Sequence, residues 1–259
     1  MARPMLDKEL ATLDAQIIKL GSLVDDALGK ALEALETGDL AKAGMVIEAD
    51  AIVDSQRAAV EEHTIRLLTL QQPLGGRDLR YLTSALSIAG DLERTGDNAA
   101  GVATIVLRMA PLKGNAPLEV LVADGSSSDT ALGGKVNMSE VNEITIMHGI
   151  SDLGKEARRV LQGTMKAFAD SNANAARYIW EEDDVVDVRY HLVRHDLMTM
   201  MSGTRAIPAL QNDTFALQRA SYLQWIAHKL ERVADHCTNI CERIVFIVDG
   251  ETTIERQNP

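Results

Sequence analysis

The chain is poor in aromatic residues and in basic residues, and each shortage argues against a class of protein. Aromatic side chains make up only 3% of the 259 residues, although 46% of the residues are hydrophobic. The core must therefore be aliphatic, which is typical of helix bundles and not of β-sandwiches. A formal net charge of −12 argues against nucleic acid as the main partner, because phosphate backbones require a basic face.

Long apolar runs and a cysteine framework are also missing. The first residues, Met1 to Asp7, hold no apolar stretch long enough for a signal peptide. The longest aliphatic and aromatic run near the end, Ile244 to Val248, is far too short to span a bilayer. Cys237 and Cys241 lie close together on one expected helix and do not indicate a secreted disulfide framework. We therefore expect a soluble, cytoplasmic protein.

What the chain does contain is helical periodicity. In the first half, apolar residues from Leu6 to Ala31 recur at alternating steps of four and three, the spacing of helices packed nearly antiparallel. Gly38 and Asp39 then supply a helix stop and a new N-cap. Two further helices are expected at about 39–70 and 77–109, separated by Pro73 and the glycines that follow it.

The second half repeats this plan. The same rhythm from Ile146 to Val160 predicts a fourth helix, which ends at a turn over 170–172. A fifth helix is expected at about 173–201 and a sixth at 214–248, separated by Ser202-Gly203 and Pro208. The fold class is therefore all-α, with six long helices in two tandem three-helix bundles related by an internal repeat.

The segment between the halves differs from both. It holds four glycines and the run Ser126-Ser127-Ser128, and it shows no helical periodicity. We interpret 113–138 as a flexible linker or insertion. It separates a first repeat at 1–112 from a second repeat at 139–259.

One short acidic signature occurs twice, as Glu93-Arg94-Thr95-Gly96-Asp97 and as Glu231-Arg232-Val233-Ala234-Asp235. Its Glu and Asp are four residues apart, so both carboxylates lie on one face of a helix. The two copies are separated by 138 residues, whereas earlier matches are separated by 133. The extra five residues must fall before the second copy, most simply in the turn around Pro208.

Each half adds a second acidic pair on the preceding helix, again with a spacing of four. If these helices are antiparallel neighbours, each repeat brings four carboxylates together. Carboxylate oxygens are hard ligands that suit iron, Mg²⁺, Mn²⁺ or Ca²⁺ and, less selectively, zinc. Shared carboxylates would favour a multinuclear site. The candidate metal ligands are Asp50, Asp54, Glu93, Asp97, Asp183, Asp187, Glu231 and Asp235.

The alternative for any one pair is a solvated surface on which Arg94 or Arg232 partners the acids. Placing like charges at this spacing costs an isolated helix roughly 0.2–0.5 kcal/mol per pair. Because both pairs recur at equivalent points of the repeat, we favour a cation that offsets this cost.

Other candidate ligands are weaker. Cys237 and Cys241 lie on the apolar stripe of the last helix and are better explained as buried structural residues. His236 follows Asp235 directly and is an auxiliary candidate. His191 and His195 are four residues apart, but isolated histidines on helices are usually structural or solvated.

These residues resemble the PhoU proteins, which regulate bacterial phosphate uptake and phosphate-starvation signalling. The matching stretches are Gln71-Gln72-Pro73, Asp78-Leu79-Arg80, Leu92 to Asp97, and Leu230 to Ile240. The resemblance implies a cytoplasmic negative regulator, often a homodimer, that binds metal clusters, commonly iron or zinc. It also implies contacts with the ATPase subunit of the phosphate-specific ABC transporter and with a sensor histidine kinase. The protein would then be peripheral to the membrane through its partners only.

The chain departs from the family pattern at a few positions. Gly101 stands where Asn239 stands in the second copy, and Ala234 replaces the glycine seen as Gly96. Thr104 stands where Glu242 does, and the central linker is longer than usual. The second copy is therefore nearer to the family pattern.

Two other classes of protein remain as alternatives. One is a carboxylate-bridged di-metal enzyme or an iron-binding protein in a helical bundle. Such sites use Glu-x-x-His, and none of the six histidines has an acidic residue three positions earlier. The other is a scaffold whose acidic faces bind a basic partner. The chain shows no nucleophile motif or phosphate-binding loop, so we expect a protein that is not an enzyme.

Overall fold

The computed structural model describes residues 3–70, 74–112, 143–206 and 214–254, and all secondary structure in these ranges is helical. The linker prediction and the turn around Pro208 lie outside the described residues. The helices are α1 (Arg3–Thr37), α2 (Leu40–Leu70), α3 (Gly76–Met109), the short 3-10 helix η1 (Ala110–Leu112), α4 (Glu143–Ala169), α5 (Ala173–Glu181), α6 (Asp183–Ala206) and α7 (Thr214–Val248).

The helix ends follow the local signals in the sequence. Gly38 adopts a left-handed conformation with φ of 68°, which ends α1 without the steric cost that a side chain would bring. Asp39 caps α2, because its Oδ1 accepts the backbone N–H of Lys42 at 3.0 Å. Asn172 caps α5 in the same way, accepting the N–H of Ala175 at 3.0 Å. These predicted boundaries are confirmed.

The fifth predicted helix, over 173–201, is wrong as a single element. It is interrupted at Glu182, whose N–H bonds to the carbonyls of Ile179 and Trp180 before α6 begins. No Gly or Pro marks this break, which falls instead in an acidic run. The break places Asp183 and Asp184 in the first turn of α6, where the helix dipole favours carboxylates. The predicted stop at 202–203 is also wrong, since α6 continues to Ala206.

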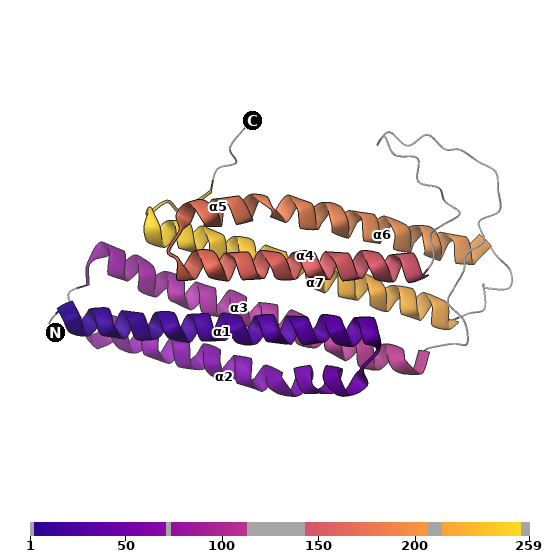
Figure 1. The fold of residues 1–259 in the computed structure, drawn as a ribbon, viewed down its shortest axis with the longest axis horizontal. Coiled ribbons are helices and arrows are strands. Elements are labelled where there is room, and N and C mark those ends of the chain that lie inside the picture. Colours follow the sequence, from indigo (N-terminus) through magenta and orange to yellow (C-terminus); the bar gives the residue numbers. More distant parts are fainter. Residues whose placement is uncertain (1–2, 71–73, 113–142, 207–213, 255–259) are drawn as a thin grey trace.

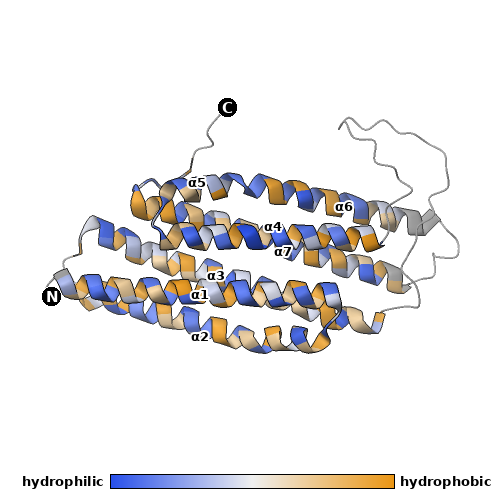
Figure 2. Cartoon of the chain, in the orientation of Figure 1, coloured by the Kyte–Doolittle hydropathy of each residue, from blue (hydrophilic) through white to orange (hydrophobic). Residues whose placement is uncertain are grey.

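The helices form two bundles that lie side by side with their long axes roughly aligned (Figure 1). Helices α1 to α3 make the first bundle, and α4 to α7 make the second. In the view of Figure 1, α1 and α4 are in front, with α3 and α7 behind them. Apolar and polar residues alternate along every helix (Figure 2), and the buried apolar residues of both bundles join in one continuous core.

The bundles meet through contacts that repeat across the two halves. A Cβ on Gly21 of α1 would lie 2.5 Å from Met165 of α4, and a Cβ on Gly154 of α4 would lie 2.3 Å from Leu32 of α1. Both glycines and both large residues are separated by 133 positions. Each half therefore supplies one glycine and one large side chain to the other, as in a symmetric dimer folded from one chain.

Candidate metal centre

The first acidic group consists of Asp50 and Asp54 on α2 with Glu93 and Asp97 on α3. Packing of α2 against α3 brings the four carboxylates near one another. Burial raises the pKa of Asp50, and the charges of Asp97 and Asp54 raise it further. Burial also raises the pKa of Glu93, again with a contribution from Asp97. Asp54 and Asp97 are exposed, so the group is open to solvent.

None of these four carboxylates forms a hydrogen bond or an ion pair with another described residue. The neighbouring Arg94 donates instead to Asp91, with its Nη1 2.7 Å from Oδ1. Arg57 pairs with Glu61 on its own helix. The nearby arginines thus make their direct contacts with other acids, and their charges only partly offset the raised pKa of Glu93.

The second acidic group consists of Asp183 and Asp187 on α6 with Glu231 and Asp235 on α7. All four side chains are half-buried, so this group is less exposed than the first. Burial, followed by the charges of Asp187 and Asp235, raises the pKa of Asp183 to about 7. Burial and the charge of Asp235 also raise the pKa of Glu231.

Two carboxylates of the second acidic group have partners on α7 itself. Arg232 donates to Asp235 with Nη1 2.8 Å from Oδ2. His228 Nδ1 lies 3.1 Å from Glu231 Oε2, and the His228 ring lies 6.4 Å from that of Tyr190 on α6. Sequence reasoning missed His228, although its position three residues before Glu231 on a helix was an available signal.

Within the ranges that the structure describes, no three His, Cys, Asp or Glu side chains stand close enough together to hold one ion. The donors nonetheless fit a hard cation. They are carboxylate oxygens from neighbouring helices, and the first acidic group lacks direct partners. The eight residues would hold metal only after their side chains turn toward one another.

The cysteines do not belong to either acidic group. Cys237 and Cys241 are fully buried, as predicted, and burial raises the pKa of both thiols, that of Cys241 to about 12. Thr164 Oγ1 lies 3.6 Å from the Cys241 sulfur. Thiols that stay protonated at neutral pH are poor metal ligands, so both residues act as core side chains.

The histidines singled out in the sequence lie elsewhere. His236 is buried against α3 of the other bundle, with Nδ1 3.4 Å from Asp91 Oδ1. Its sequence position beside Asp235 is misleading, because consecutive helical residues point about 100° apart. His191 and His195 are exposed on α6, and His191 contacts the ring of Tyr190 at 5.6 Å.

Two departures from the repeat have a packing explanation. A Cβ on Gly101 would lie 2.4 Å from the end of the Lys229 side chain, so the glycine lets this lysine of α7 lie directly against α3. A Cβ on Gly96 would lie 3.0 Å from Val53, which explains a glycine between the two pairs of the first acidic group. Ala234, at the matching place in α7, shows that the second bundle accommodates a methyl group there.

Fold and site together define a class of protein: an all-α chain of two similar three-helix bundles, each with paired carboxylates on neighbouring helices. The model of the PhoU domain matches twice, over residues 17–106 and 150–244. A PhoU homolog of the phosphate-specific transport system from Streptococcus pneumoniae is 31% identical over 249 residues, covering 96% of this chain and 97% of that protein. Another from Clostridium acetobutylicum is 25% identical and covers 97% of both.

Solved structures give the same result. The crystal structure of the phosphate transport system regulatory protein PhoU from Streptococcus pneumoniae superposes with a TM-score of 0.69 at 28% identity, covering 95% of this chain and 98% of that one. PhoU from Pseudomonas aeruginosa superposes with a TM-score of 0.76 at 25% identity, covering 95% and 99%. The chain belongs to the PhoU family.

Proposed function

We propose that this PhoU-family protein is a metal-binding negative regulator of phosphate uptake and phosphate-starvation signalling. The observation that carries the regulatory role is the double PhoU domain, because the relatives matched over nearly their whole length are accessory proteins of phosphate-specific transport systems. Those relatives are named as accessory or regulatory proteins and not as enzymes.

Metal binding is supported by the first acidic group. Four carboxylates on two packed helices have no direct basic partner in the described part of the chain, and the pKa values of Asp50 and Glu93 are raised. A cation would supply the missing countercharge. Iron or zinc is the first choice because of the family resemblance, and Mg²⁺, Mn²⁺ or Ca²⁺ would also suit the carboxylate oxygens.

The proposed partners are the ATPase subunit of the phosphate ABC transporter and its sensor histidine kinase. Long rigid helices with acidic faces and a net charge of −12 suit docking to proteins with basic surfaces. Among the described helices, none has the length and apolarity needed to cross a bilayer. We propose a homodimer in the cytoplasm that reaches the membrane through these partners, and light scattering of the purified protein tests the dimer.

A deletion strain tests the regulatory role. Without this protein, phosphate-starvation genes should stay on in abundant phosphate, and phosphate or polyphosphate should accumulate. A plasmid copy should restore repression, and a copy carrying Glu231→Gln and Asp235→Asn should restore it only in part. Normal repression in the deletion strain, with no second PhoU-family gene present, would contradict the regulatory role.

The metal and the regulatory role can fail separately. Metal analysis of protein purified without chelators or a metal-affinity tag should find bound cation in the wild type. If the protein is metal-free but the deletion strain is derepressed, the regulatory proposal stands and the metal proposal is wrong.

A further inference from the structure

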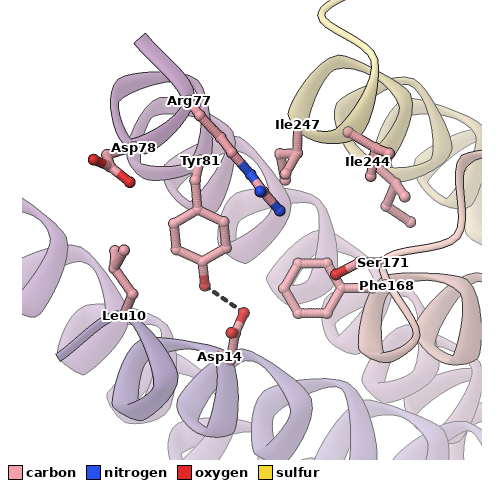
Figure 3. A pocket seen from close by; sticks show the side chains of 10 residues that line it. Leu10, Asp14, Arg77, Asp78, Tyr81, Phe168, Ser171, Ile244 and Ile247 are labelled. Atoms are coloured by element: carbon pink, nitrogen blue, oxygen red, sulfur yellow. Dashed lines mark hydrogen bonds between the residues drawn. The ribbon is translucent and has the colours of Figure 1, made fainter. Parts of the chain in front are cut away.

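A cavity of about 260 Å³ lies where the start of α3 meets the end of α7 (Figure 3). Its walls come from α1 and α3 of the first bundle and from α4 and α7 of the second. It shares no residue with either acidic group. A molecule held here would contact both bundles at once.

One side of the cavity carries a half-buried carboxyl group. Tyr81 donates its hydroxyl to Asp14 Oδ1 at 2.6 Å (Figure 3). That is the one hydrogen bond of Asp14 with the described residues, so Oδ2 retains its capacity to accept. Asp14 is half-buried and forms no ion pair with a described basic residue, and burial raises the pKa of its carboxyl group.

The mouth of the cavity carries the opposite charge. The guanidinium of Arg77 extends over the cavity between Tyr81 and Ile247 (Figure 3). Arg77 forms no ion pair or hydrogen bond with another described residue, so its fork of N–H donors is available. A planar guanidinium with free donors suits a carboxylate, which it can bind through two parallel hydrogen bonds.

The remaining walls are apolar. Phe168 of α4 faces the ring of Tyr81 across the cavity, and Ile244 and Ile247 of α7 close its other side. Such walls favour a compact apolar or aromatic group, because its burial removes apolar surface from water. The volume of about 260 Å³ suits a small molecule.

We propose that this cavity binds a small zwitterion with an apolar side chain, such as a free hydrophobic amino acid. Its carboxylate would bind Arg77, its ammonium would bind Asp14 Oδ2, and its side chain would lie against Phe168. Phosphate is a poor alternative, because the buried carboxyl group of Asp78 adds a second acid to the lining and an inorganic anion has no apolar group. Because both bundles line the cavity, occupancy would fix their relative position.

Calorimetric titration of the full chain with L-phenylalanine and L-leucine tests this site. Both should bind and should raise the melting temperature. L-Phenylalaninamide lacks the carboxylate and 3-phenylpropionate lacks the ammonium, so each should bind roughly tenfold or more weakly, as the loss of one charge-assisted hydrogen bond predicts. Inorganic phosphate should produce neither heat nor a shift in melting temperature.

Variants separate this cavity from binding elsewhere. Arg77→Gln and Asp14→Asn should each weaken L-phenylalanine binding roughly tenfold or more, and the asparagine can still accept the Tyr81 hydroxyl. Arg108→Gln, at the exposed far end of α3, is the matched control and should bind like the wild type. The proposal is overturned if neither amino acid binds at millimolar concentration, if both cavity variants bind normally, or if phosphate binds as well as phenylalanine does.

Discussion

Asp25 and Arg158 occupy equivalent positions in the two halves, 133 residues apart, and they pair with each other where α1 crosses α4. Arg158 Nε lies 2.8 Å from Asp25 Oδ1, and Nη2 lies 3.0 Å from Oδ2, a bidentate arrangement. When two equivalent halves pack about a two-fold axis, a residue close to the axis lies opposite the equivalent residue of the other half. Identical charges there would repel, and the chain has opposite charges instead.

Asp25→Asn should lower the free energy of unfolding by about 1 kcal/mol, since the pair is bidentate but partly exposed. Exchanging the charges, with Asp25→Arg and Arg158→Asp together, should recover only part of this loss. Gly29 makes room for the guanidinium of Arg158, whereas its equivalent at the swapped position is Gln162, which has a side chain. Urea unfolding measures both. Full recovery by the exchange would show that Gly29 has no role.

Two Gly→Ala changes should have opposite effects on stability, because Gly44 faces open space whereas Gly154 lies where α4 approaches α1 closely. Gly44 on α2 has nothing within 4 Å of an added Cβ, so Gly44→Ala should stabilise the protein by about 0.5–1 kcal/mol through helix propensity. Gly154→Ala places its Cβ 2.3 Å from buried Leu32, and overpacking should outweigh propensity by about 1 kcal/mol. Thermal melts of the two variants measure the difference, and equal shifts would contradict the packing argument.

Helix existence and most helix ends could be predicted from the sequence, because both depend on local signals. The stop at Gly38 and the caps at Asp39 and Asn172 each involve residues within one turn. The break at Glu182 could not be predicted in this way, since no Gly or Pro marks it. The break falls in a run of acids, and Glu182 accepts a hydrogen bond from Arg159 of α4 at 2.9 Å, a contact that depends on the tertiary fold.

The candidate site was only partly accessible to sequence reasoning. The internal repeat identified which acids correspond, and antiparallel packing within each bundle brought them together. Contacts between the bundles had no such signal. The approach of His236 to Asp91 and the cavity beside Tyr81 both depend on how α3 packs against helices of the second bundle.

The pKa of Asp183, near 7, predicts a pH dependence of stability in chelator-treated protein. The folded-state pKa is raised above its ordinary value of 3.8, so the folded protein holds this proton more tightly than the unfolded chain does. The contribution of protonated Asp183 to the free energy of unfolding is therefore fully present below about pH 4 and is lost as the pH rises through 7. Asp183→Asn should flatten this decline and stabilise the protein at pH 8 by on the order of 1 kcal/mol, after allowing for solvent screening. Urea unfolding at pH 5 and pH 8 measures the effect. The exposed neighbour change Glu181→Gln is the control, and a decline unchanged by Asp183→Asn would contradict the assignment.

Removing the charges of the first acidic group should separate two effects of these charges on stability, which are repulsion in metal-free protein and stabilisation by a bound cation. In metal-free protein, Asp54→Asn, Glu93→Gln and Asp97→Asn together should be neutral or slightly stabilising, because the three acids repel one another and form no direct ion pair with a described residue. With cation at about one hundred times its dissociation constant, each site of the wild type gains about 2.7 kcal/mol by mass action. The triple variant should lose the contribution of the first group and keep that of the second.

Calorimetric titration with Zn²⁺, and anaerobically with Fe²⁺, counts the sites directly. A control protein with Glu48→Gln, Glu62→Gln and Asp170→Asn loses the same charge from exposed positions and should bind like the wild type. If cations and chelators leave the melting temperature of the wild type unchanged, the carboxylates bind no metal and the first acidic group is a solvated surface.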